Sequence, residues 1–312
     1  MNPITAGVIL TRRCNLNCKY CAIPDRRATE LPAKDWLRAI DIIADFGIRK
    51  INFIGGEATL YKDVREVVSH ALKKIEYCSL ITNGIKGYPV VKDLLSLGLK
   101  NVSFSLDTAD VENSISPIKA KAGLELIKAL DKDNLLKDNN LTAYCVINKT
   151  NIGTIPALVE YLSDKNVGTY FLPFHWSKDE KYEHRKADCG LAVCNDEKLD
   201  ILLHKLSEMK KSGYLIRNSV AFFNAIKQYI DRLDWKCSYL SELRIDSDGK
   251  MMCCCDKQGQ VHNTYTIFDL KEEKVFRQFL QDRKKDADAC CGCLWPSSYE
   301  AENWNREINN AF

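Results

Sequence analysis

A regular alternation of short β-rich runs with amphipathic stretches, sustained through about residue 175, is the feature that most constrains how this chain can fold. The strand candidates are residues 5–10, 50–54, 78–82, 101–106, 142–147 and 168–174, and the amphipathic stretches are 34–46, 63–74, 89–97, 117–130, 154–165 and 196–211. Such alternation predicts βα units and a parallel sheet. Six units with right-handed crossovers close most of a barrel, so we expect an α/β fold with a partial (β/α)6, TIM-like barrel.

The rhythm changes after about residue 215. An amphipathic stretch at 219–233 leads to Cys237, residues 242–255 read as a hairpin that turns at Asp248-Gly249, and a helix candidate follows at 271–283. This region has few strands and many cysteines. We therefore expect a barrel over residues 1–215 and, over residues 216–312, a small domain that a metal site holds together.

Charge and hydropathy exclude several classes of function. The 45 Lys and Arg residues nearly balance the 42 Asp and Glu residues, so charge makes no case for nucleic acid or an anionic membrane as a partner. No apolar run approaches the roughly 20 residues of a membrane helix, and the N-terminus lacks the features of a signal peptide. We expect a cytoplasmic protein.

The fourteen cysteines are the anomaly in this composition. The cytosol keeps thiols reduced, so disulfides are a poor explanation for them. Nine of them gather in three clumps, at positions 14, 18 and 21, at 253–255, and at 290, 291 and 293. Clumping at short spacing indicates metal ligation.

Cys14, Cys18 and Cys21 follow directly on the first strand candidate. A structural zinc site would need four ligands, and this segment has three thiols and no nearby His. Three thiolates suit a [4Fe–4S] cluster with one iron free of protein ligands. A substrate or cofactor can bind at that open iron, at the barrel edge where catalysis is expected.

The Cys-x3-Cys-x2-Cys spacing after a first strand resembles the radical S-adenosylmethionine (SAM) superfamily. The resemblance implies that the open iron chelates SAM, whose reductive cleavage gives a 5′-deoxyadenosyl radical that abstracts hydrogen from substrate. The aromatic residue before the third cysteine is Tyr20, which the resemblance assigns to adenine. It also implies a flavodoxin- or ferredoxin-type electron donor.

Gly55, Gly56 and Glu57 follow the second strand candidate and resemble the GGE motif that meets the SAM amino group. The family often has Pro next, where this chain has Ala58. A tight turn between strand and helix is the alternative reading.

Other residues at strand ends resemble SAM-binding positions of the family. They are Thr82, Asn83, Ser105, Asp107, Asn148 and Leu172. Ser103 and Ser105 share one face of a strand candidate, and such a polar face is unusual on a buried parallel strand. We expect this face to point into the barrel near its rim. Asn148 could instead cap a helix, and Asn83 could belong to an Asn-Gly turn.

The C-terminal cysteines resemble the SPASM/twitch extension of radical SAM enzymes. Eleven residues separate Cys237 from Gly249, four more precede Cys254, and Cys290-x2-Cys293 follows. No cysteine lies beyond Cys293, which matches the short twitch form with one cluster. The resemblance therefore implies one auxiliary [4Fe–4S] cluster held by Cys237, Cys254, Cys290 and Cys293.

Three alternatives remain open at these clumps. Cys255 could replace Cys254, Cys291 competes with Cys290, and a zinc ribbon also suits four thiols in two groups. Cys253 and Cys255 are in addition candidate hydrogen donors, because neighbouring strand residues face opposite ways.

The resemblance implies an oxidoreductase or epimerase that acts on a C–H bond. The chain is too short for the leader-peptide domain of many peptide maturases, which favours a small molecule or short peptide as substrate. We expect oxidation, with the auxiliary cluster as electron acceptor. The alternatives are redox-neutral epimerisation with a cysteine hydrogen donor, maturation of a ribosomal peptide, and a zinc-held interaction module without enzymatic activity.

Overall fold

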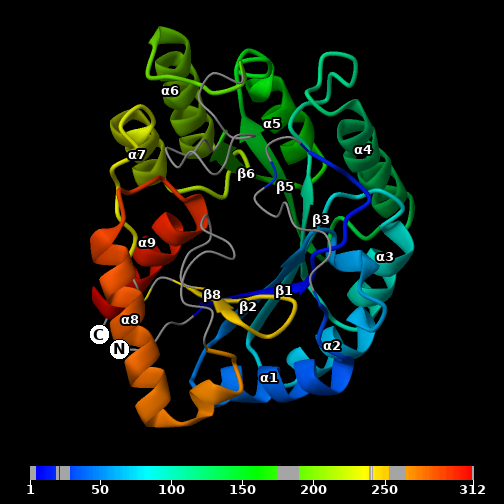
Figure 1. Ribbon diagram of the computed structural model, residues 1–312. Coiled ribbons are helices and arrows are strands. Elements are labelled where there is room, and N and C mark those ends of the chain that lie inside the picture. Colours follow the sequence, from blue (N-terminus) through cyan, green and yellow to red (C-terminus); the bar gives the residue numbers. More distant parts are fainter. Residues whose placement is uncertain are drawn as a thin grey trace.

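The computed structural model describes residues 5–18, 21, 29–174, 190–238, 240, 242–252 and 265–310, and the side chains of residues 304–310 lie outside this description. One eight-stranded sheet, in the order β6-β5-β4-β3-β2-β1-β7-β8, curves around a central lumen with helices on its outer side (Figure 1). The first six strands are parallel, as a partial TIM-like barrel requires. The predicted fold class is confirmed.

The strands are β1 Thr5–Thr11, β2 Lys50–Gly55, β3 Tyr77–Thr82, β4 Asn101–Ser105, β5 Asn140–Ile147, β6 Gly168–Pro173, β7 Leu243–Ile245 and β8 Met251–Met252. The helices are α1 Ala33–Asp45, α2 Val64–Ala71, α3 Tyr88–Ser96, α4 Pro117–Lys132, α5 Ile155–Asp164, α6 Glu197–Lys211, α7 Val220–Tyr229, α8 Glu273–Ala289 and α9 Pro296–Asn310, with short 3-10 turns at Ala58–Leu60 and Asp269–Lys271. All six predicted strands of the barrel are present, with ends shifted by one or two residues.

Side chains of opposite character cover the two faces of the barrel sheet. On β1, Ala6, Val8 and Leu10 are fully buried in the core that the sheet shares with the outer helices. The alternate positions face the lumen, and many of them are polar, such as Asn52 on β2 and Ser103 on β4. The expected polar face of β4 is confirmed, and it extends to the neighbouring strands.

Cys78 and Cys145 lie on the helix-facing side, where both are buried in the same core. Burial raises the pKa of the Cys78 thiol to about 12 and that of Cys145 well above its ordinary value. Both are core residues without the exposure that ligation or catalysis needs. No helix in the described part of the chain is both long enough and apolar enough to span a bilayer.

The predicted C-terminal hairpin exists and joins the barrel sheet directly. Strand β7 pairs in parallel with β1, and β8 returns antiparallel to β7. The turn closes with the Gly249 amide donating to the Asp246 carbonyl at 2.9 Å, and Gly249 has a φ of 82°, a conformation that favours glycine. The first strands of the C-terminal region thus continue the barrel, and the domain boundary at residue 215 remains a prediction.

A buried ion pair fastens this hairpin to the start of the cysteine loop. The Arg12 guanidinium donates to both carboxylate oxygens of Asp246, from Nε at 2.8 Å and from Nη2, and each residue is 5% exposed. The Asp246 carboxylate also accepts from the Ser247 amide at 2.7 Å. A bidentate pair of this kind fixes orientation as well as distance between its two elements.

Removal of one partner of this pair should strongly destabilise the protein. We expect Asp246→Ala to lower the free energy of unfolding by about 3–5 kcal/mol, because it removes the bidentate carboxylate partner of the buried Arg12 charge. The double variant Arg12→Met with Asp246→Leu should recover much of the loss, since it removes both charges. Anaerobic denaturant unfolding of the three proteins measures both values, and equal stability of wild type and Asp246→Ala would contradict the role given to the pair.

Candidate active site at the carboxyl ends of the barrel strands

The three cysteines of the first clump lie in the loop that leaves the carboxyl end of β1. Cys14, Cys18 and Cys21 are all half-buried, and the Cys21 amide donates to the Cys18 carbonyl at 3.1 Å in a tight turn. The Cys21 side chain packs on Ile9 and Met252, which connects the loop to the lumen face of β1 and to β8. The loop therefore presents its thiols at the rim of the barrel.

The number of these thiols suits a cluster better than a single zinc ion. A tetrahedral zinc site needs four donors, whereas a four-iron cube with one open iron needs three thiolates, each at a different iron. The donor set of three soft thiolates fits a [4Fe–4S] cluster with Cys14, Cys18 and Cys21 as its ligands.

The Gly55-Gly56 pair of the second motif packs directly against the backbone of the cysteine loop. The Gly56 amide donates to the Thr11 carbonyl and the Glu57 amide to the Arg13 carbonyl, both at 2.8 Å. A Cβ on Gly55 would lie 2.6 Å from the Thr11 carbonyl oxygen, and one on Gly56 would overlap the Arg12 and Arg13 carbonyl oxygens. Glycine is required here because two backbones touch, and the contact of Gly55 and Gly56 with SAM remains a prediction.

Glu57 joins the second and third loops through its carboxylate. One oxygen accepts from the Thr82 hydroxyl at 2.7 Å and the other from the Asn83 amide at 2.6 Å. The Thr59 hydroxyl adds a bond of 2.6 Å, and Glu57 is only 1% exposed. A buried carboxylate with these charge-assisted bonds is a rigid anchor. The contact of Glu57 with the SAM amino group remains a prediction.

Asn83 carries this network to the first cysteine. Its side-chain nitrogen Nδ2 donates to Asn15 Oδ1 at 2.7 Å and lies 3.7 Å from Cys14 Sγ. The backbone amide of Leu16 lies 3.4 Å from the same sulfur. Hydrogen bonds to ligating sulfurs orient the ligand and tune the potential of a cluster. Asn83 is thus a positioning residue for Cys14, a role that its motif did not reveal.

Asp107 follows β4 and is held inside the protein by Lys119 of α4. The Lys119 ammonium lies 2.7 Å from Asp107 Oδ2, and both side chains are almost completely buried. Asp107 Oδ1 also accepts from the Val146 amide at 2.9 Å. Burial raises the pKa of the Cys18 thiol, and the positive charge of Lys119 opposes this rise. Lys119 therefore adds positive charge near the cysteine loop.

The sequence analysis missed Lys119, although a signal exists. It lies four residues before Gly123 and seven before Leu126, and both of these face the core. A lysine on the apolar stripe of a helix is unusual and calls for a buried partner.

The other predicted SAM contacts divide into two groups. Ser105 and Leu172 are partly exposed at alternate positions that face the lumen near the rim. Asn148 is fully buried, and its side-chain amide bonds Thr150 and the Val146 carbonyl within its own loop. The residue that caps α5 is Thr154, so the alternative that Asn148 caps this helix is wrong, and its contact with SAM remains a prediction. Four predicted residues lie outside the described part of the chain: Tyr20, Cys253, Cys254 and Cys255.

Two C-terminal cysteine segments lie side by side. The Cys293 amide donates to the Trp235 carbonyl at 2.8 Å, two residues from Cys237. A Cβ on Gly292 would lie 2.7 Å from the Asp234 backbone, and the φ of Gly292 is 99°. Cys290 Sγ accepts from the Gly292 amide at 3.4 Å, whereas Cys291 is exposed. The predicted ligands Cys237, Cys290 and Cys293 thus come from adjacent segments.

Comparison with known proteins identifies the barrel. The family model described as Radical SAM superfamily matches residues 8–162. The chain is 32% identical over 157 residues to a PqqA peptide cyclase from Granulibacter bethesdensis, which covers 48% of this chain and 41% of that protein. It is 28% identical over 261 residues to the GTP 3′,8-cyclase of Chlorobaculum tepidum, which covers 79% of this chain and 77% of that protein.

Among solved structures, Streptococcus suis SuiB bound to precursor peptide SuiA matches with a TM-score of 0.69 at 16% identity, over 88% of this chain and 64% of that chain. SuiB has also been solved bound to S-adenosylmethionine. At this identity the likeness shows the fold. The chain spans about half the length of the first two curated relatives, 41% of one and 52% of the other.

Substitution of Gly56 should disturb the cysteine loop itself. We expect Gly56→Ala to cost about 1–3 kcal/mol of stability through overpacking, and to lower both the iron content and the SAM affinity of the reconstituted protein. The matched control is Gly153→Ala, because no atom lies within 4 Å of its added methyl group. Iron analysis and SAM titration distinguish the two. Full iron content with weakened SAM binding would instead favour direct contact of Gly56 with SAM.

Proposed function

We propose, from the premise that this chain belongs to the radical SAM superfamily through residues 8–162, that it cleaves SAM reductively. The radical so formed abstracts a hydrogen atom from an unactivated C–H bond of a small molecule or short peptide. The superfamily uses SAM and a [4Fe–4S] cluster, which together supply the radical chemistry when bound. The protein supplies binding, orientation and exclusion of water.

One observation carries the proposal. The loop with Cys14, Cys18 and Cys21 leaves β1 at the catalytic rim of the barrel, and the loops after β2 and β3 are hydrogen-bonded to it. A zinc-held module would have no use for this convergence of three strand ends on a three-thiol loop. A site that must hold a cluster and a cofactor in fixed relation to a substrate does require it.

The residues near the loop take distinct roles in this proposal. Ser105 and Leu172 face the lumen beside the rim and are available to the ribose and adenine of SAM. Asp107 is engaged by Lys119, so its contribution is to fix the Lys119 ammonium near Cys18. That positive charge favours the deprotonated thiolates that iron requires.

The substrate class is inferred from the relatives. The matched proteins include peptide and nucleotide cyclases by name, and SuiB is named with a precursor peptide. These names support a peptide or a small molecule as substrate. We assign an oxidative reaction. After one hydrogen atom is abstracted, the substrate radical would lose a proton, and an auxiliary cluster would take its remaining electron.

The auxiliary cluster would be held by Cys237, Cys290 and Cys293 together with Cys254. The adjacency of residues 234–237 to residues 290–293 supports this set, and the exposure of Cys291 favours Cys290 as the ligand of that pair. Three soft thiolates from two packed segments fit either a cube or a zinc ribbon by donor chemistry. Metal analysis decides between them.

Replacement of Cys14, Cys18 and Cys21 together by Ala should abolish reductive cleavage of SAM. The expected readout is the loss of 5′-deoxyadenosine under anaerobic reducing conditions, because the cluster loses its thiolate ligands. Cys194→Ala, which changes an exposed thiol outside the three cysteine clumps of the sequence, is the control and should retain cleavage. Persistent 5′-deoxyadenosine formation in the triple variant would refute the proposed function.

The second cysteine group predicts a stoichiometry. We expect seven to eight irons per reconstituted chain, from two four-iron clusters, and a loss of about four in Cys237→Ala with SAM cleavage retained. Cys291→Ala should keep the full iron content, since that thiol is exposed and is not one of the assigned ligands. Four irons and one zinc in the wild type would overturn the auxiliary-cluster assignment.

A further inference from the structure

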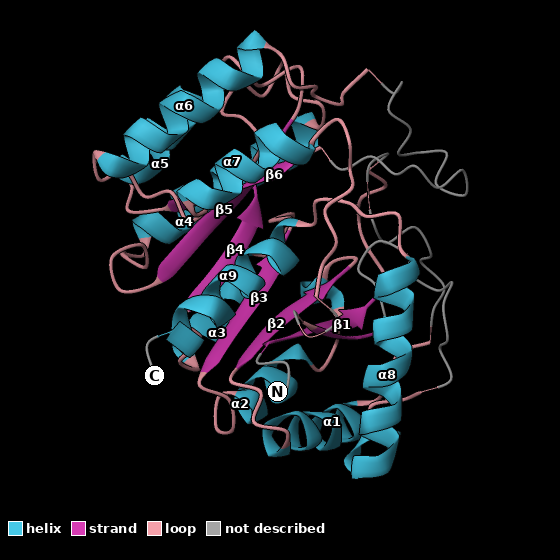
Figure 2. Cartoon of the chain, turned by 90° about the vertical axis from the view of Figure 1, so that its left-hand side faces the viewer, coloured by secondary structure: helices cyan, strands magenta, loops and turns pink. Residues whose placement is uncertain are grey.

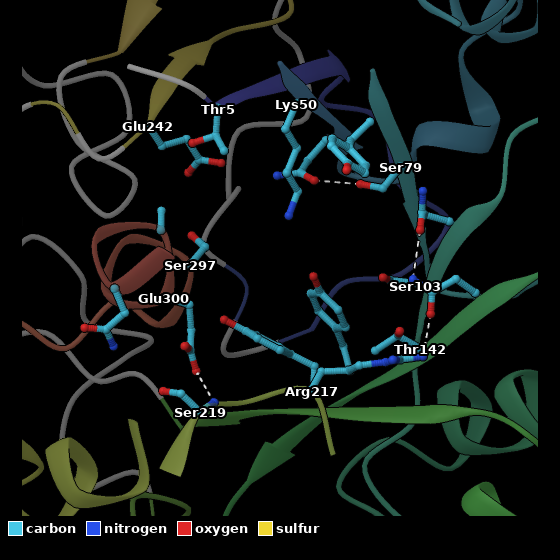
Figure 3. A pocket seen from close by; sticks show the side chains of 18 of the residues that line it. Thr5, Lys50, Ser79, Ser103, Thr142, Arg217, Ser219, Glu242, Ser297 and Glu300 are labelled. Atoms are coloured by element: carbon cyan, nitrogen blue, oxygen red, sulfur yellow. Dashed lines mark hydrogen bonds between the residues drawn. The ribbon is translucent and has the colours of Figure 1, made fainter. Parts of the chain in front are cut away.

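A polar cavity of about 730 Å³ occupies the barrel lumen at the amino ends of the strands, opposite the cysteine rim. Its wall begins with the first residues of the strands, such as Thr5 and Lys50, and is completed by Ser297 and Glu300 of α9 (Figure 3). We call it the lumen cavity. Its volume is in the range of small-molecule sites.

An apolar layer separates the lumen cavity from the cysteine loop. Alternate residues on β1 and β2 face the lumen, so Thr5 and Lys50 line the cavity while Ile9 and Ile54 lie nearer the rim. Ile9 is fully buried and packs with Met252, and Cys21 contacts this pair from the rim side. This layer lies on the β1 and β2 side of the barrel, whereas Ser103 and Tyr170 of the cavity wall lie two positions before Ser105 and Leu172 on the same strand faces.

Lys50 is the group in the cavity wall that most clearly indicates a bound anion. Its side chain points into the lumen cavity (Figure 3), and within the described residues it has neither a hydrogen bond nor an ion pair. Burial lowers the pKa of Lys50, and the negative charge of Glu242 only partly opposes this. An ammonium in a cavity wall that has no partner among the described residues can bind an anion.

The other charges of the wall do not satisfy Lys50. Glu242 forms its own ion pair with Arg244 at 3.0 Å, and both residues are buried. Glu300 accepts from the Ser219 amide at 2.9 Å, and burial raises the pKa of its carboxyl group. Lys210 also lines the wall, and its positive charge partly opposes this rise in the pKa of Glu300. The described wall therefore carries an excess of positive charge.

The same wall offers an aromatic surface and hydroxyl groups. The Tyr144 and Tyr170 rings of β5 and β6 lie 4.9 Å apart between centroids, at 30° to each other. Ser79 of β3 and Ser103 of β4 also line the cavity, and the Ser79 hydroxyl donates to Asn52 Oδ1 at 2.6 Å. An organic body can pack on the rings while hydroxyls bond its polar atoms.

We propose that the lumen cavity binds a small organic oxyanion, with its carboxylate or phosphate on Lys50 and its body against Tyr144 and Tyr170. No residue in the wall of the lumen cavity is among those assigned to SAM or to a cluster, and the proposal does not depend on the proposed function. Carboxylates and phosphates share the charged oxygens that an ammonium recognises, so the test includes both.

The test compares small probes on the full-length reconstituted protein by anaerobic titration calorimetry. Benzoate and phenyl phosphate carry the two head groups, and benzamide is the neutral isostere of benzoate. We expect millimolar or tighter binding of at least one anion and at least tenfold weaker binding of benzamide. Binding of neither anion, or equal binding of benzoate and benzamide, would overturn the proposal.

Substitutions of Lys50 test whether the anion binds in the lumen cavity. Lys50→Met should weaken anion binding at least tenfold without lowering the melting temperature of the ligand-free protein, since it removes an unpartnered ammonium. Lys121→Met, at a side chain that is 70% exposed, is the matched control and should bind as wild type does. Lys50→Gln gives a second reading if Lys50→Met fails to fold. Unchanged affinity in the Lys50 variants would refute the assignment.

A final variant separates this site from the rim. The protein with Ala at positions 14, 18 and 21 should still bind the anion, because the apolar layer divides the two sites. Loss of anion binding in that variant, with Lys50 intact, would place the anion at the rim and overturn the proposal, whatever the outcome of the SAM-cleavage assay.

Discussion

The Glu57 carboxylate is the constraint on which the geometry of the rim depends. It is 1% exposed, and its two oxygens receive the Thr82 hydroxyl and the Asn83 amide at 2.7 and 2.6 Å. A buried carboxylate is stable only when its charge is met by donors. Because these donors come from the loop after β3 and Glu57 follows β2, the charge forces two strand ends together. The backbone of the β2 loop in turn holds the cysteine loop.

The barrel carries different chemistry at its two ends. At the carboxyl ends, loop backbones and soft thiolates meet, with Lys119 and Asp107 buried beneath them. At the amino ends, the lumen is lined by charged, hydroxyl and aromatic side chains and is partly covered by α9. Figure 2 shows how the helices cover the outer side of the sheet, which is where the apolar side chains of the strands pack. The lumen is thereby left to polar residues, which a parallel sheet covered on both faces could not accommodate.

Much of the fold could be predicted from the sequence because it is encoded locally. The strands of the barrel are short β-rich runs bounded by turns, and the Asp248-Gly249 turn is a strong hairpin signal. Two features depend on contacts between distant segments and could not be predicted. The parallel pairing of β7 with β1 joins residues more than 230 positions apart, as Ala6 opposite Leu243 shows. The steric reason for Gly56 also appears only once the Arg12 and Arg13 carbonyls are in place.

The candidate site follows the same division between local and distant information. The spacing of Cys14, Cys18 and Cys21 is a local signal and sufficed to predict a cluster loop at the end of a strand. The motif order also predicted that Thr82 and Asn83 lie near it. Their roles could not be predicted, because a motif does not state which partner a side chain takes. Asn83 bonds Asn15 and approaches Cys14 rather than only closing a turn.

The pairing of β7 with β1 also bears on how the C-terminal cysteines relate to the rim. Strand β1 ends at the loop with the first three cysteines, and β7 lies beside it in the same sheet. The Arg12–Asp246 pair fixes the end of β7 against the first residues of that loop. A C-terminal region joined only by a linker could change its distance from the rim, whereas strand pairing and a buried bidentate ion pair resist such movement. Electron transfer from a substrate to a second cluster would need a fixed distance of this kind, and the barrel sheet itself provides the rigid element that could set it.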